Sequence, residues 1–546
     1  MIKEITITVQ AQDEKNTGLH DKLICRELKK NHINENKFEK VFVKKSIDAR
    51  HGQLKLHLRY RVYIGEKPEA SSEWKPAWKD SSGAGLERTV IIVGAGPAGL
   101  FGAFRLLESG IKPVIIERGR VTSERRKDIA LISTRGIVNE DSNYCFGEGG
   151  AGTFSDGKLY TRSNKRGDIG TVLKIFNYFG ADEKILTDAH PHIGTDRLPQ
   201  VINAMREKII SLGGEFHFQK RVTGFILTSE KASVSAASKA RPRVCGVEVK
   251  DTVSGETQNF KGAAVLLATG HSAPDIYEMV AKTAPTALEA KTFAAGVRVE
   301  HPRELIDAIQ YHGRGAEAGL GAAEYRVTTQ VDGRGFYSFC MCPGGFVVPS
   351  SSGPDEIVVN GMSAAARNSK WSNAALVVEI RPEDIPQKFY DEAAKLGCPQ
   401  LAGLLFRTEI ERLAAANGKG QAAPAQRLTD FLEGRISKDL PSSSYTAGLV
   451  KSELGSWLPT HISDRMKKGF KEIDKSMHGF VCPDALMIAV ETRTSTPVRI
   501  LRDKESCECT AIAGLYPAGE GSGYSGGIVS SAMDGENVCS SIARLL

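Results

Sequence analysis

Three glycines near residue 95 have the spacing of a loop that binds a dinucleotide. Gly94, Gly96 and Gly99 occur in the sequence GAGPAG, directly after the apolar run TVIIV. The first glycine permits a tight turn, the second lets the backbone approach phosphates, and the third lets a helix pack closely on a strand. Pro97 and Ala98 begin the expected helix, whose N-terminal amides would face a pyrophosphate. The spacing therefore predicts a dinucleotide-binding turn.

An acidic residue closes the next expected strand at the distance that such a site requires. Residues 114–117 (VIIE) follow the helix, so Glu117 stands where a carboxylate accepts a hydrogen bond from a ribose hydroxyl. We assign Arg118, the next residue, to the same site. Glycine turns alone are weak evidence, but here the strand, the turn, the helix and the acid are all in register.

A second glycine loop lies near the C-terminus, in the sequence GLYPAGEGSGYSGGI. A strand should lead into Gly519 and Glu520, and a closing helix should run from Ile528 to about residue 545. Gly526 and Gly527 precede that helix. Its free N-terminal amides would stabilise negative charge on the N1–O2 edge of a reduced flavin.

A third segment contributes to the same expected site. The apolar strand AAVLLATG ends on Thr269 and Gly270 after a β-rich stretch, and in flavoproteins of the glutathione-reductase type such a strand end packs beside the cofactor. Two dinucleotide-binding elements at opposite ends of the sequence, with an insertion between them, favour FAD over NAD as the tightly held cofactor.

The segment at residues 147–156 is too rich in glycine for an ordinary strand or helix. Its backbone is expected to approach a flat ligand, the isoalloxazine ring or the ribityl chain of FAD. Lys158 either lies near flavin N5 or an anionic substrate, or is a surface lysine. The residues of this segment that we assign to the cofactor are Gly149, Gly150, Ala151, Gly152, Ser155 and Asp156.

Two further side chains are candidates for catalysis. His192 could act as a general acid or base with Asp196, because the ordinary pKa of histidine is near neutrality. Alternatively, Asp196 caps the following helix and His192 bonds to the backbone. Arg493 could clamp a substrate carboxylate, or it could form an ion pair that fixes its own loop.

The cysteines allow two interpretations. Cys340 and Cys342 could form a strained, reducible disulfide that exchanges electrons with a nearby flavin. Buried structural thiols are favoured, because flavin disulfide reductases usually carry a longer Cys-x-x-x-x-Cys motif in the first domain. Pooling this pair with Cys507 and Cys509 does not give the spacing of a zinc site, so we expect no metal.

Several longer motifs extend this interpretation over nearly the whole chain. They are residues 46–50 (SIDAR), 93–99 (VGAGPAG), 145–159 (CFGEGGAGTFSDGKL), 191–196 (PHIGTD), 339–345 (FCMCPGG), 360–363 (NGMS), 491–495 (ETRTS) and 516–521 (YPAGEG). In these motifs the chain resembles the uncharacterised FAD-dependent dehydrogenases related to glutathione-reductase-like flavoproteins. The resemblance implies FAD and a flavoprotein core, with no agreed substrate. Pro274 departs from the arginine that such proteins commonly carry there.

Composition limits the other possibilities. No apolar run in the 546 residues approaches the ~18 needed to cross a bilayer, and the N-terminus has no signal-peptide core. We expect a cytoplasmic protein that does not bind membranes. The net charge is +7, and residues 1–89 carry 18 Lys and Arg against 13 Asp and Glu. An acidic partner or a nucleic acid could explain this excess, but a solvated face is preferred because no RNA-binding signature accompanies it.

The fold class expected is α/β with an α+β insertion. We expect a small N-terminal α/β domain at 1–64, a linker at 65–86, and a Rossmann-type FAD-binding domain split between 87–285 and 476–546. An inserted substrate domain should occupy residues 286–475.

These patterns predict an FAD-dependent oxidoreductase that moves a hydride between a small organic substrate and flavin N5. NAD(P)H is a possible electron donor. Two alternatives stay open. One is a flavoprotein that acts on or binds RNA through its basic N-terminal domain, and the other is a flavin-dependent isomerase or hydratase without net redox chemistry.

Overall fold

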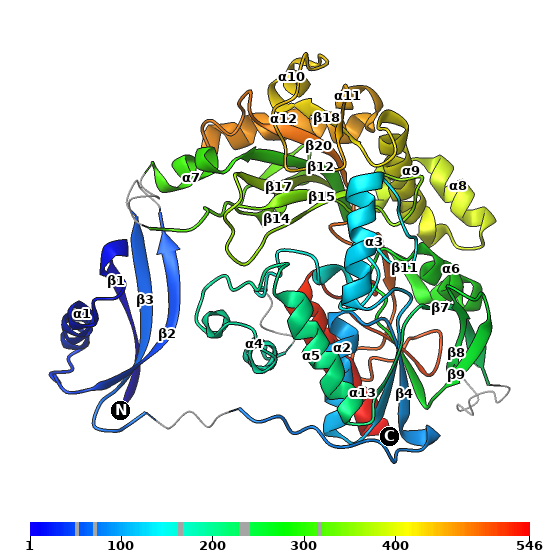
Figure 1. Ribbon diagram of the computed structural model, residues 1–546, viewed down its shortest axis with the longest axis horizontal. Helices are drawn as coiled ribbons and strands as arrows, with labels where there is room; N and C mark the ends of the chain where they lie inside the picture. Colours follow the sequence, from blue (N-terminus) through cyan, green and yellow to red (C-terminus); the bar gives the residue numbers. More distant parts are fainter. Residues whose placement is uncertain (50–53, 69–73, 162–166, 229–240, 314–318) are drawn as a thin grey trace.

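The computed structural model describes residues 1–49, 54–68, 74–161, 167–228, 241–313 and 319–546. Arg50 of the SIDAR motif lies outside these ranges. Figure 1 shows a small N-terminal domain beside a large body in which two different sheets lie one above the other.

The N-terminal domain is a three-stranded antiparallel sheet in the order β1-β3-β2 with one helix. Its elements are β1 (Ile2–Val9), α1 (Thr17–Lys30), β2 (Glu39–Asp48) and β3 (Lys55–Tyr63). Alternate apolar residues of β3, such as Leu56 and Leu58, are buried in a core shared with α1, as expected for a strand with one solvated face. On the other face Arg61 pairs with Glu4 at 3.2 Å.

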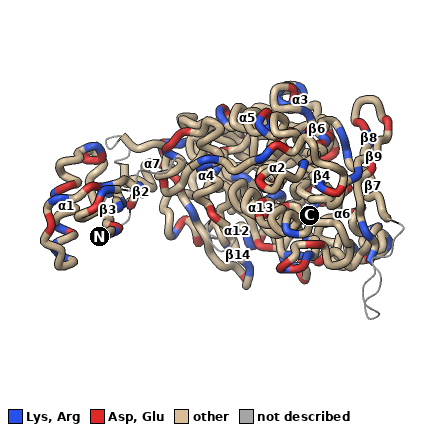
Figure 2. The backbone as a smooth tube through the Cα atoms, turned by 90° about the horizontal axis from the view of Figure 1, so that it is seen from below, with Lys and Arg blue, Asp and Glu red and all other residues tan. Residues whose placement is uncertain are grey.

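Basic and acidic residues are interspersed along the backbone of this domain, as the blue and red segments of Figure 2 show. Lys45 pairs with Glu14 at 2.8 Å, Arg59 lies 3.7 Å from Glu4, and Lys40 pairs with Asp21. These basic residues therefore have carboxylate partners within their own domain.

The linker is held against the large body by aromatic contacts. Trp78 stacks on Phe104, with ring centroids 4.2 Å apart, and on Phe179 at 5.6 Å. Trp74 meets Tyr178 edge-on at 5.9 Å. The described residues between 65 and 85 contain no helix or strand.

A five-stranded parallel sheet forms the lower part of the large body, in the order β22-β10-β4-β5-β6. Its strands are β4 (Thr89–Val93), β5 (Lys112–Ile116), β6 (Glu215–His217), β10 (Ala264–Leu267) and β22 (Leu515–Pro517). Strand β22, from the C-terminal end of the chain, pairs with β10, so this fold is split in sequence as predicted. Helices α2 (Pro97–Glu108) and α13 (Ile528–Leu545) pack on each other beside the sheet, and α5 (Leu198–Ser211) lies next to α2.

The register of this sheet brings three loops together. Leu267 of β10 pairs with Val93 of β4 on one side and with Pro517 of β22 on the other. Because the strands are parallel, their carboxyl ends lie at one edge, where ligands bind in open α/β sheets. The loops that start at residues 94, 268 and 518 therefore leave the sheet side by side.

An antiparallel meander and several helices complete this part. The meander contains β7 (Lys220–Leu227), β8 (Val244–Asp251) and β9 (Thr257–Lys261). Residues 229–243 are rich in Ser, Ala and Lys, a composition that predicts a surface insertion, and most of them lie outside the described residues. Pro274 is the first residue of α6 (Pro274–Thr283), where the missing N–H of proline costs nothing. The remaining helices are α3 (Thr122–Arg135) and α4 (Ile169–Tyr178).

A seven-stranded mixed sheet forms the inserted domain, in the order β13-β14-β17-β12-β20-β18-β19. Its strands are β12 (Phe293–Pro302), β13 (Thr328–Val331), β14 (Arg334–Cys342), β17 (Trp371–Ile380), β18 (Ala423–Arg427), β19 (Leu449–Lys451) and β20 (Leu486–Glu491). The short strands β15 (Phe346–Pro349) and β16 (Val359–Met362) pair with each other, as do β11 (Leu288–Ala290) and β21 (Val498–Ile500).

Helices surround this upper sheet in Figure 1. They are α7 (Arg303–Tyr311), α8 (Gln387–Lys395), α9 (Ala402–Asn417), α10 (Leu428–Glu433), α11 (Leu454–Trp457) and α12 (Thr460–Ser476). No helix in the described parts of the chain is long and apolar enough to span a membrane.

The boundary expected at residue 475 is wrong. Strand β20 pairs with β12 and β18 of the inserted sheet, so this sheet extends to Glu491. All residues of β20 are buried, and a fully buried apolar run does not reveal which of two neighbouring sheets it joins.

Candidate functional site

A cavity of about 410 Å³ lies at the carboxyl edge of the parallel sheet, against the inserted domain. Its lining comes from both ends of the chain and from the insertion. All predicted site residues line it except three, Gly99, Gly149 and His192. The sequence therefore located the cavity correctly, although individual residues play different parts from those expected.

Gly99 and Gly149 support the cavity wall from behind. A Cβ atom on Gly99 would lie 2.1 Å from the carbonyl oxygen of Gly94, so only glycine permits this helix–strand contact. This is the packing function predicted for the third glycine of the motif. The amide of Gly149 donates to the carbonyl of Ala95 at 2.9 Å, and Gly149 lines a small apolar pocket next to the main cavity.

The two glycine loops of the first domain touch each other. A Cβ atom on Gly150 would lie 3.1 Å from the Cα of Gly96, and Gly150 has a φ of +66°. A side chain at residue 150 would therefore separate the loops and fill the space between them. Ala151 and Gly152 continue the wall from this contact.

Two long helices begin at the cavity without side-chain caps. The N-cap residues are Gly96 for α2 and Gly527 for α13, and neither helix receives a side-chain hydrogen bond at its N-terminus. Both N-caps line the cavity. Uncapped N-terminal amides and the helix dipole attract anionic groups such as a pyrophosphate.

Glu117 holds three separate parts of the backbone. Its Oε2 accepts from the amide of Ala95 at 2.9 Å, and its Oε1 accepts from Gly119 and Gly147, both at 2.9 Å. An ionised carboxylate has about four acceptor positions, so about one is left for a ribose hydroxyl. The role that the sequence did not reveal is structural, since Glu117 ties the glycine loops at 94–96 and 147 to its own strand.

Arg118 lies in the same wall. Its guanidinium is 3.2 Å from both Asp141 and Asp275 and stacks over the ring of Phe146 at 4.3 Å. These contacts fix the side chain in the lining that Glu117 shares.

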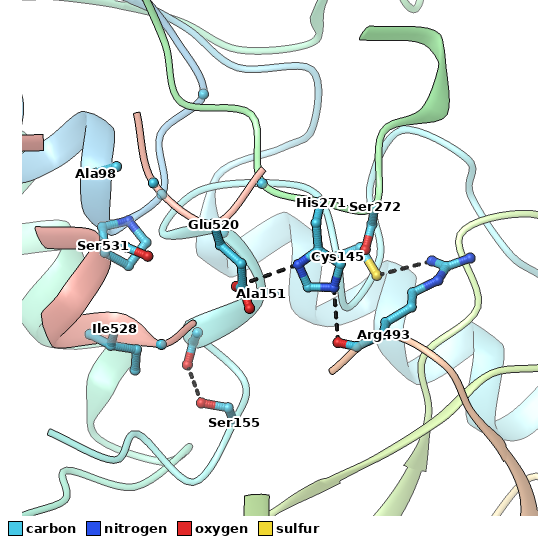
Figure 3. Close-up of a pocket in the computed structure, with 18 of the residues that line it drawn as sticks. Ala98, Cys145, Ala151, Ser155, His271, Ser272, Arg493, Glu520, Ile528 and Ser531 are labelled. Carbon is cyan, nitrogen blue, oxygen red and sulfur yellow. Dashed lines mark hydrogen bonds and ion pairs between the residues drawn. The ribbon is translucent and has the colours of Figure 1, made fainter. Parts of the chain in front are cut away.

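The C-terminal loop is fixed by a hydrogen bond from its backbone. Its Glu520 lies next to His271 (Figure 3). The amide of Gly519 donates to Asp534 at 2.8 Å, and Asp534 also pairs with Arg502 at 2.6 Å. Glu520 Oε2 lies 3.4 Å from Nδ1 of His271. The Nε2 of His271 is bonded to the carbonyl oxygen of Arg493 at 2.9 Å, so this nitrogen carries the proton and donates.

Arg493 does not have a free guanidinium for a substrate. Its five N–H donors point at Glu411, Glu356, Ser352 and Cys145, with distances to the two carboxylates of 2.7–3.1 Å and to the Cys145 sulfur of 3.5 Å. A guanidinium has only five donors. The predicted substrate clamp is therefore wrong, and the alternative, an ion pair that fixes its loop, describes the side chain.

The charge on Glu356 depends on this arginine. Burial alone would raise the pKa of Glu356, but the charge of Arg493 and hydrogen bonds from Ser352 lower it to about 2. Glu411 is fully buried against Arg493 and Arg407. The cluster is thus a buried set of compensating charges behind the cavity wall.

Lys158 and Asp156 form a second charged group, and it lines the cavity directly. Asp156 lies 2.6 Å from Arg367 and 2.9 Å from the Nζ of Lys158. Burial would raise the pKa of Asp156, but the charges of Lys158 and Arg367 hold it well below its ordinary value. Burial would likewise lower the pKa of Lys158, and Asp156 raises it instead. Lys158 is therefore a buried cation and not the surface lysine of the alternative interpretation.

Two polar atoms in the lining lack hydrogen-bond partners among the described residues. They are the Nζ of Lys158, which has an ion pair but no well-directed hydrogen bond, and the hydroxyl of Tyr325. Buried polar groups are nearly always hydrogen-bonded in folded proteins. Lys158 is still paired with Asp156 at 2.9 Å, so of these two atoms the Tyr325 hydroxyl alone lacks any partner among the described residues.

His192 lies outside the lining. Its Nε2 is 3.2 Å from the carbonyl oxygen of Ala365, and the Ala365 amide donates to Asp196 at 2.7 Å. Both side chains thus fasten the 364–365 segment. Helix α5 begins after Arg197 without a side-chain cap, so the capping role considered for Asp196 is wrong. The backbone bond considered for His192 is present, and its position does not support the acid–base role.

Several lining residues were not predicted. His271 directly follows the Thr-Gly strand end, and this proximity in sequence was a usable signal. Tyr325 comes from the inserted domain, where no motif marks it. Cys340 stands in the motif at 339–345 and was interpreted as a buried structural thiol, and Cys145 begins the motif at 145–159 but received no role. Within the described ranges no group of three or more His, Cys, Asp or Glu is placed to hold a metal ion.

Comparison with known families matches three parts of the chain. Residues 87–136 match an FAD binding domain, residues 292–494 match the description "FAD-dependent protein, C-terminal domain-like", and residues 1–63 match a domain of unknown function. The second match begins and ends with the inserted sheet.

A full-length relative has the same extent. An uncharacterized protein of Clostridium beijerinckii is 37% identical over 539 residues, which cover 96% of this chain and 95% of that protein.

Solved structures are more distant. A quinol fumarate reductase FrdA variant of E. coli is 12% identical over 84% of this chain and 70% of its own, with a TM-score of 0.34. CtdE in complex with FAD is 10% identical over 84% of both chains, also with a TM-score of 0.34. Likenesses of this size carry no argument about function.

Proposed function

Because this chain belongs to a family of FAD-dependent proteins and is an FAD-dependent oxidoreductase, we propose that it transfers a hydride between a small organic substrate and N5 of the flavin. The observation that carries the proposal is the composition of one cavity. Loops from both ends of the chain and the inserted sheet meet there, and Lys158 and Tyr325 are among the residues that line it.

The residues present fit FAD. The contact between Gly96 and Gly150 leaves backbone exposed to the cavity, and the uncapped ends of α2 and α13 suit its negatively charged groups. Glu117 has about one acceptor position left for a ribose hydroxyl. When bound, FAD supplies a hydride acceptor and donor that no amino-acid side chain offers.

The substrate is assigned to the side of the cavity formed by the inserted domain. Tyr325 and Cys340 of the inserted domain lie in this wall together with Lys158 of the FAD-binding domain, and we call these three residues the insert wall. A buried cation and an unpaired hydroxyl would orient a substrate with acceptor atoms and exclude water from the reacting centre. Reduced nicotinamide, NADH or NADPH, is proposed as the electron donor.

No observation favours the alternative of a nucleic-acid partner. Basic side chains of the N-terminal sheet pair with carboxylates of the same domain. Lys40 pairs with Asp21, Lys45 with Glu14 and Arg61 with Glu4. A cytoplasmic location remains part of the proposal. It is supported by ten cysteines that are all free thiols, which is usual in a reducing compartment.

The test is anaerobic reduction of the purified FAD-loaded protein. NADH and NADPH are added separately, and the flavin absorbance is followed near its ordinary maximum at about 450 nm. A set of small oxidants is then supplied. We expect bleaching by one nucleotide and recovery with the right oxidant. Protein that takes up no FAD would refute the proposal. Turnover with no spectral change would favour the isomerase or hydratase alternative.

A further inference from the structure

The Cys340-Met-Cys342 segment interrupts strand β14 at the cavity. The ladder between β14 and β17 is regular up to Phe339 and resumes at Cys342, so the register shifts between them. Cys340 has a φ of +44°, a conformation that is uncommon for residues other than glycine. The bulge places Cys340 in the cavity lining, whereas Cys342 is completely buried behind it. The expected pair of buried structural thiols is thus two thiols in different environments.

Two buried cations face this pair. The Nη1 of Arg298 lies 3.8 Å from the Cys342 sulfur, and its Nη2 donates to the carbonyl oxygen of Cys340 at 2.9 Å. Lys158, the orphaned cation of the insert wall, interacts electrostatically with both thiols. Asp156 and Glu491 are the nearby carboxylates, and they are paired with Lys158 and Arg298 respectively.

The thiol of Cys342 donates to the backbone carbonyl oxygen of Cys340 at 3.4 Å, so the two residues are in direct contact. The neighbouring Cys342 thiol and the charges of Lys158 and Arg298 outweigh burial and lower the pKa of Cys340 to about 5. The same contact raises the pKa of Cys342. One thiol is therefore poised to be a thiolate, and the other keeps its proton next to it. This is the arrangement of an attacking and a resolving cysteine.

We propose that Cys340 and Cys342 are a reactive thiol pair of the insert wall, and that the substrate of this site is a small organic disulfide. The Cys340 thiolate attacks one sulfur of the substrate, which forms a mixed disulfide and releases the other half as a thiolate. The Cys342 thiol then loses its proton and attacks the Cys340 sulfur, forming the Cys340–Cys342 disulfide and releasing the second half. One substrate disulfide is reduced to two thiols, and the protein dithiol is oxidised by two electrons.

The inference rests on the proposed function for the FAD and its nicotinamide donor, and it replaces direct hydride transfer to the substrate by transfer through the thiols. The flavin reduced by NADH or NADPH gives two electrons to the Cys340–Cys342 disulfide, which takes up two protons and returns to the dithiol. Lys158 acts as a positioning residue, since it holds the negative charge on Cys340. The Tyr325 hydroxyl supplies a donor to polar atoms of the substrate.

The test uses the full-length FAD-loaded protein and 5,5′-dithiobis(2-nitrobenzoate) as the probe disulfide. Substoichiometric probe should react first at Cys340 and leave a peptide containing Cys340 and Cys342 that has lost two hydrogens, as seen by mass spectrometry. In Cys342→Ser the reaction should stop at a stable mixed disulfide on Cys340. The matched control Cys245→Ser changes a half-buried thiol of β8 outside the cavity and should behave as wild type.

A second arm tests the charge. Lys158→Met should slow labelling of Cys340 by iodoacetamide at pH 6 by about tenfold, because less thiolate is present, and Lys158→Arg should restore most of the rate. Each variant is compared at equal FAD content and equal thermal stability. If Cys25 or another thiol reacts before Cys340, or if Cys342→Ser traps no adduct, the inference is overturned.

The two proposals fail in different ways. If the protein binds no FAD, the proposed function is refuted whatever the thiols do. If FAD binds and is reduced by a nicotinamide while Cys340 stays unreactive, only the inference about the thiol pair is lost.

Discussion

The two walls of the cavity differ in how far their polar groups are satisfied by the protein itself. In the wall around Glu117, the carboxylate is saturated by backbone donors to about three of its four positions, and the glycine loops are in direct contact. In the insert wall, the Tyr325 hydroxyl has no hydrogen-bond partner among the described residues, Lys158 has only its ion pair with Asp156, and the Cys340 thiol lies in the lining in front of the buried Cys342. The first wall is complete before a ligand arrives, and the second needs one.

This difference separates the part of the site that holds the cofactor from the part that reacts with the substrate. A saturated polar wall is rigid and fixes a cofactor in one position, whereas unsatisfied buried groups cost stability and are kept where they act on a ligand. Changes in the first wall should therefore affect stability and FAD affinity. Changes in the second wall should affect reactivity, and removal of an unsatisfied group there should stabilise the free protein.

The largest effect is expected from the arginine behind the cavity. Arg493→Met leaves Glu356 and Glu411 buried without their cation, which should lower the free energy of unfolding by about 3–5 kcal/mol. Chemical denaturation measures this loss. Arg499→Met, which removes a partly exposed pair with Glu289, is the control and should cost at most about 1 kcal/mol. Equal losses in the two variants would contradict the assignment.

The pH dependence of the stability should test the same cluster of Arg493, Glu356 and Glu411. The pKa of Glu356 falls from 4.5 to about 2 on folding, so its contribution is fully present above pH 4.5 and is lost as the pH falls towards 2. The integrated contribution is about 3 kcal/mol. Denaturation between pH 5 and 2.5 should therefore show a steeper loss of stability for wild type than for Glu356→Gln. Parallel curves would show that Arg493 does not hold this charge.

Removal of the Glu117 carboxylate should come next. Glu117→Ala leaves the amides of Ala95, Gly119 and Gly147 without acceptors and should weaken FAD binding on the order of 100-fold, equivalent to about 2–3 kcal/mol. Glu117→Gln keeps one acceptor oxygen and should fall between this variant and wild type. Fluorescence titration of the apoprotein with FAD measures the affinity. An unchanged Kd in Glu117→Ala would mean that the first wall does not depend on this residue.

The smallest effect is expected at Tyr325, where the substitution should raise the stability of the ligand-free protein instead of lowering it. Tyr325→Phe removes an orphaned hydroxyl, so it should stabilise the ligand-free protein by about 1 kcal/mol while it weakens substrate binding. Thermal unfolding with and without substrate separates the two effects. If Tyr325→Phe destabilises the free protein, the hydroxyl has a partner and the contrast between the walls is weaker.

The sequence predicted one wall much better than the other, for a physical reason. Loops that contact a dinucleotide need glycines at fixed spacing, so Gly96, Gly150 and Gly519 could be assigned from local sequence alone. The insert wall is assembled by pairing of strands far apart in the chain, and nothing local marks Tyr325. Arg493 was misread because its partners Glu356 and Glu411 come from other elements, and no spacing rule relates them.

The boundaries of helices, strands and domains were likewise predicted well only where the local sequence marks them. An element with a local signal was placed closely, as the closing helix α13 at Ile528–Leu545 shows. Strand β20 was assigned to the wrong domain because its buried apolar sequence suits either sheet, and only its pairing with β12 distinguishes them.

The pairing of Leu267 with Pro517 also has a consequence for biosynthesis. Strand β22 and helix α13 follow every other element of the cofactor site in the chain, so a nascent chain cannot close this site until they have been synthesised. Contacts of such long sequence separation form slowly, and the inserted domain has time to fold first. The availability of FAD once these elements have been made should therefore influence how much of the newly made protein reaches the native state.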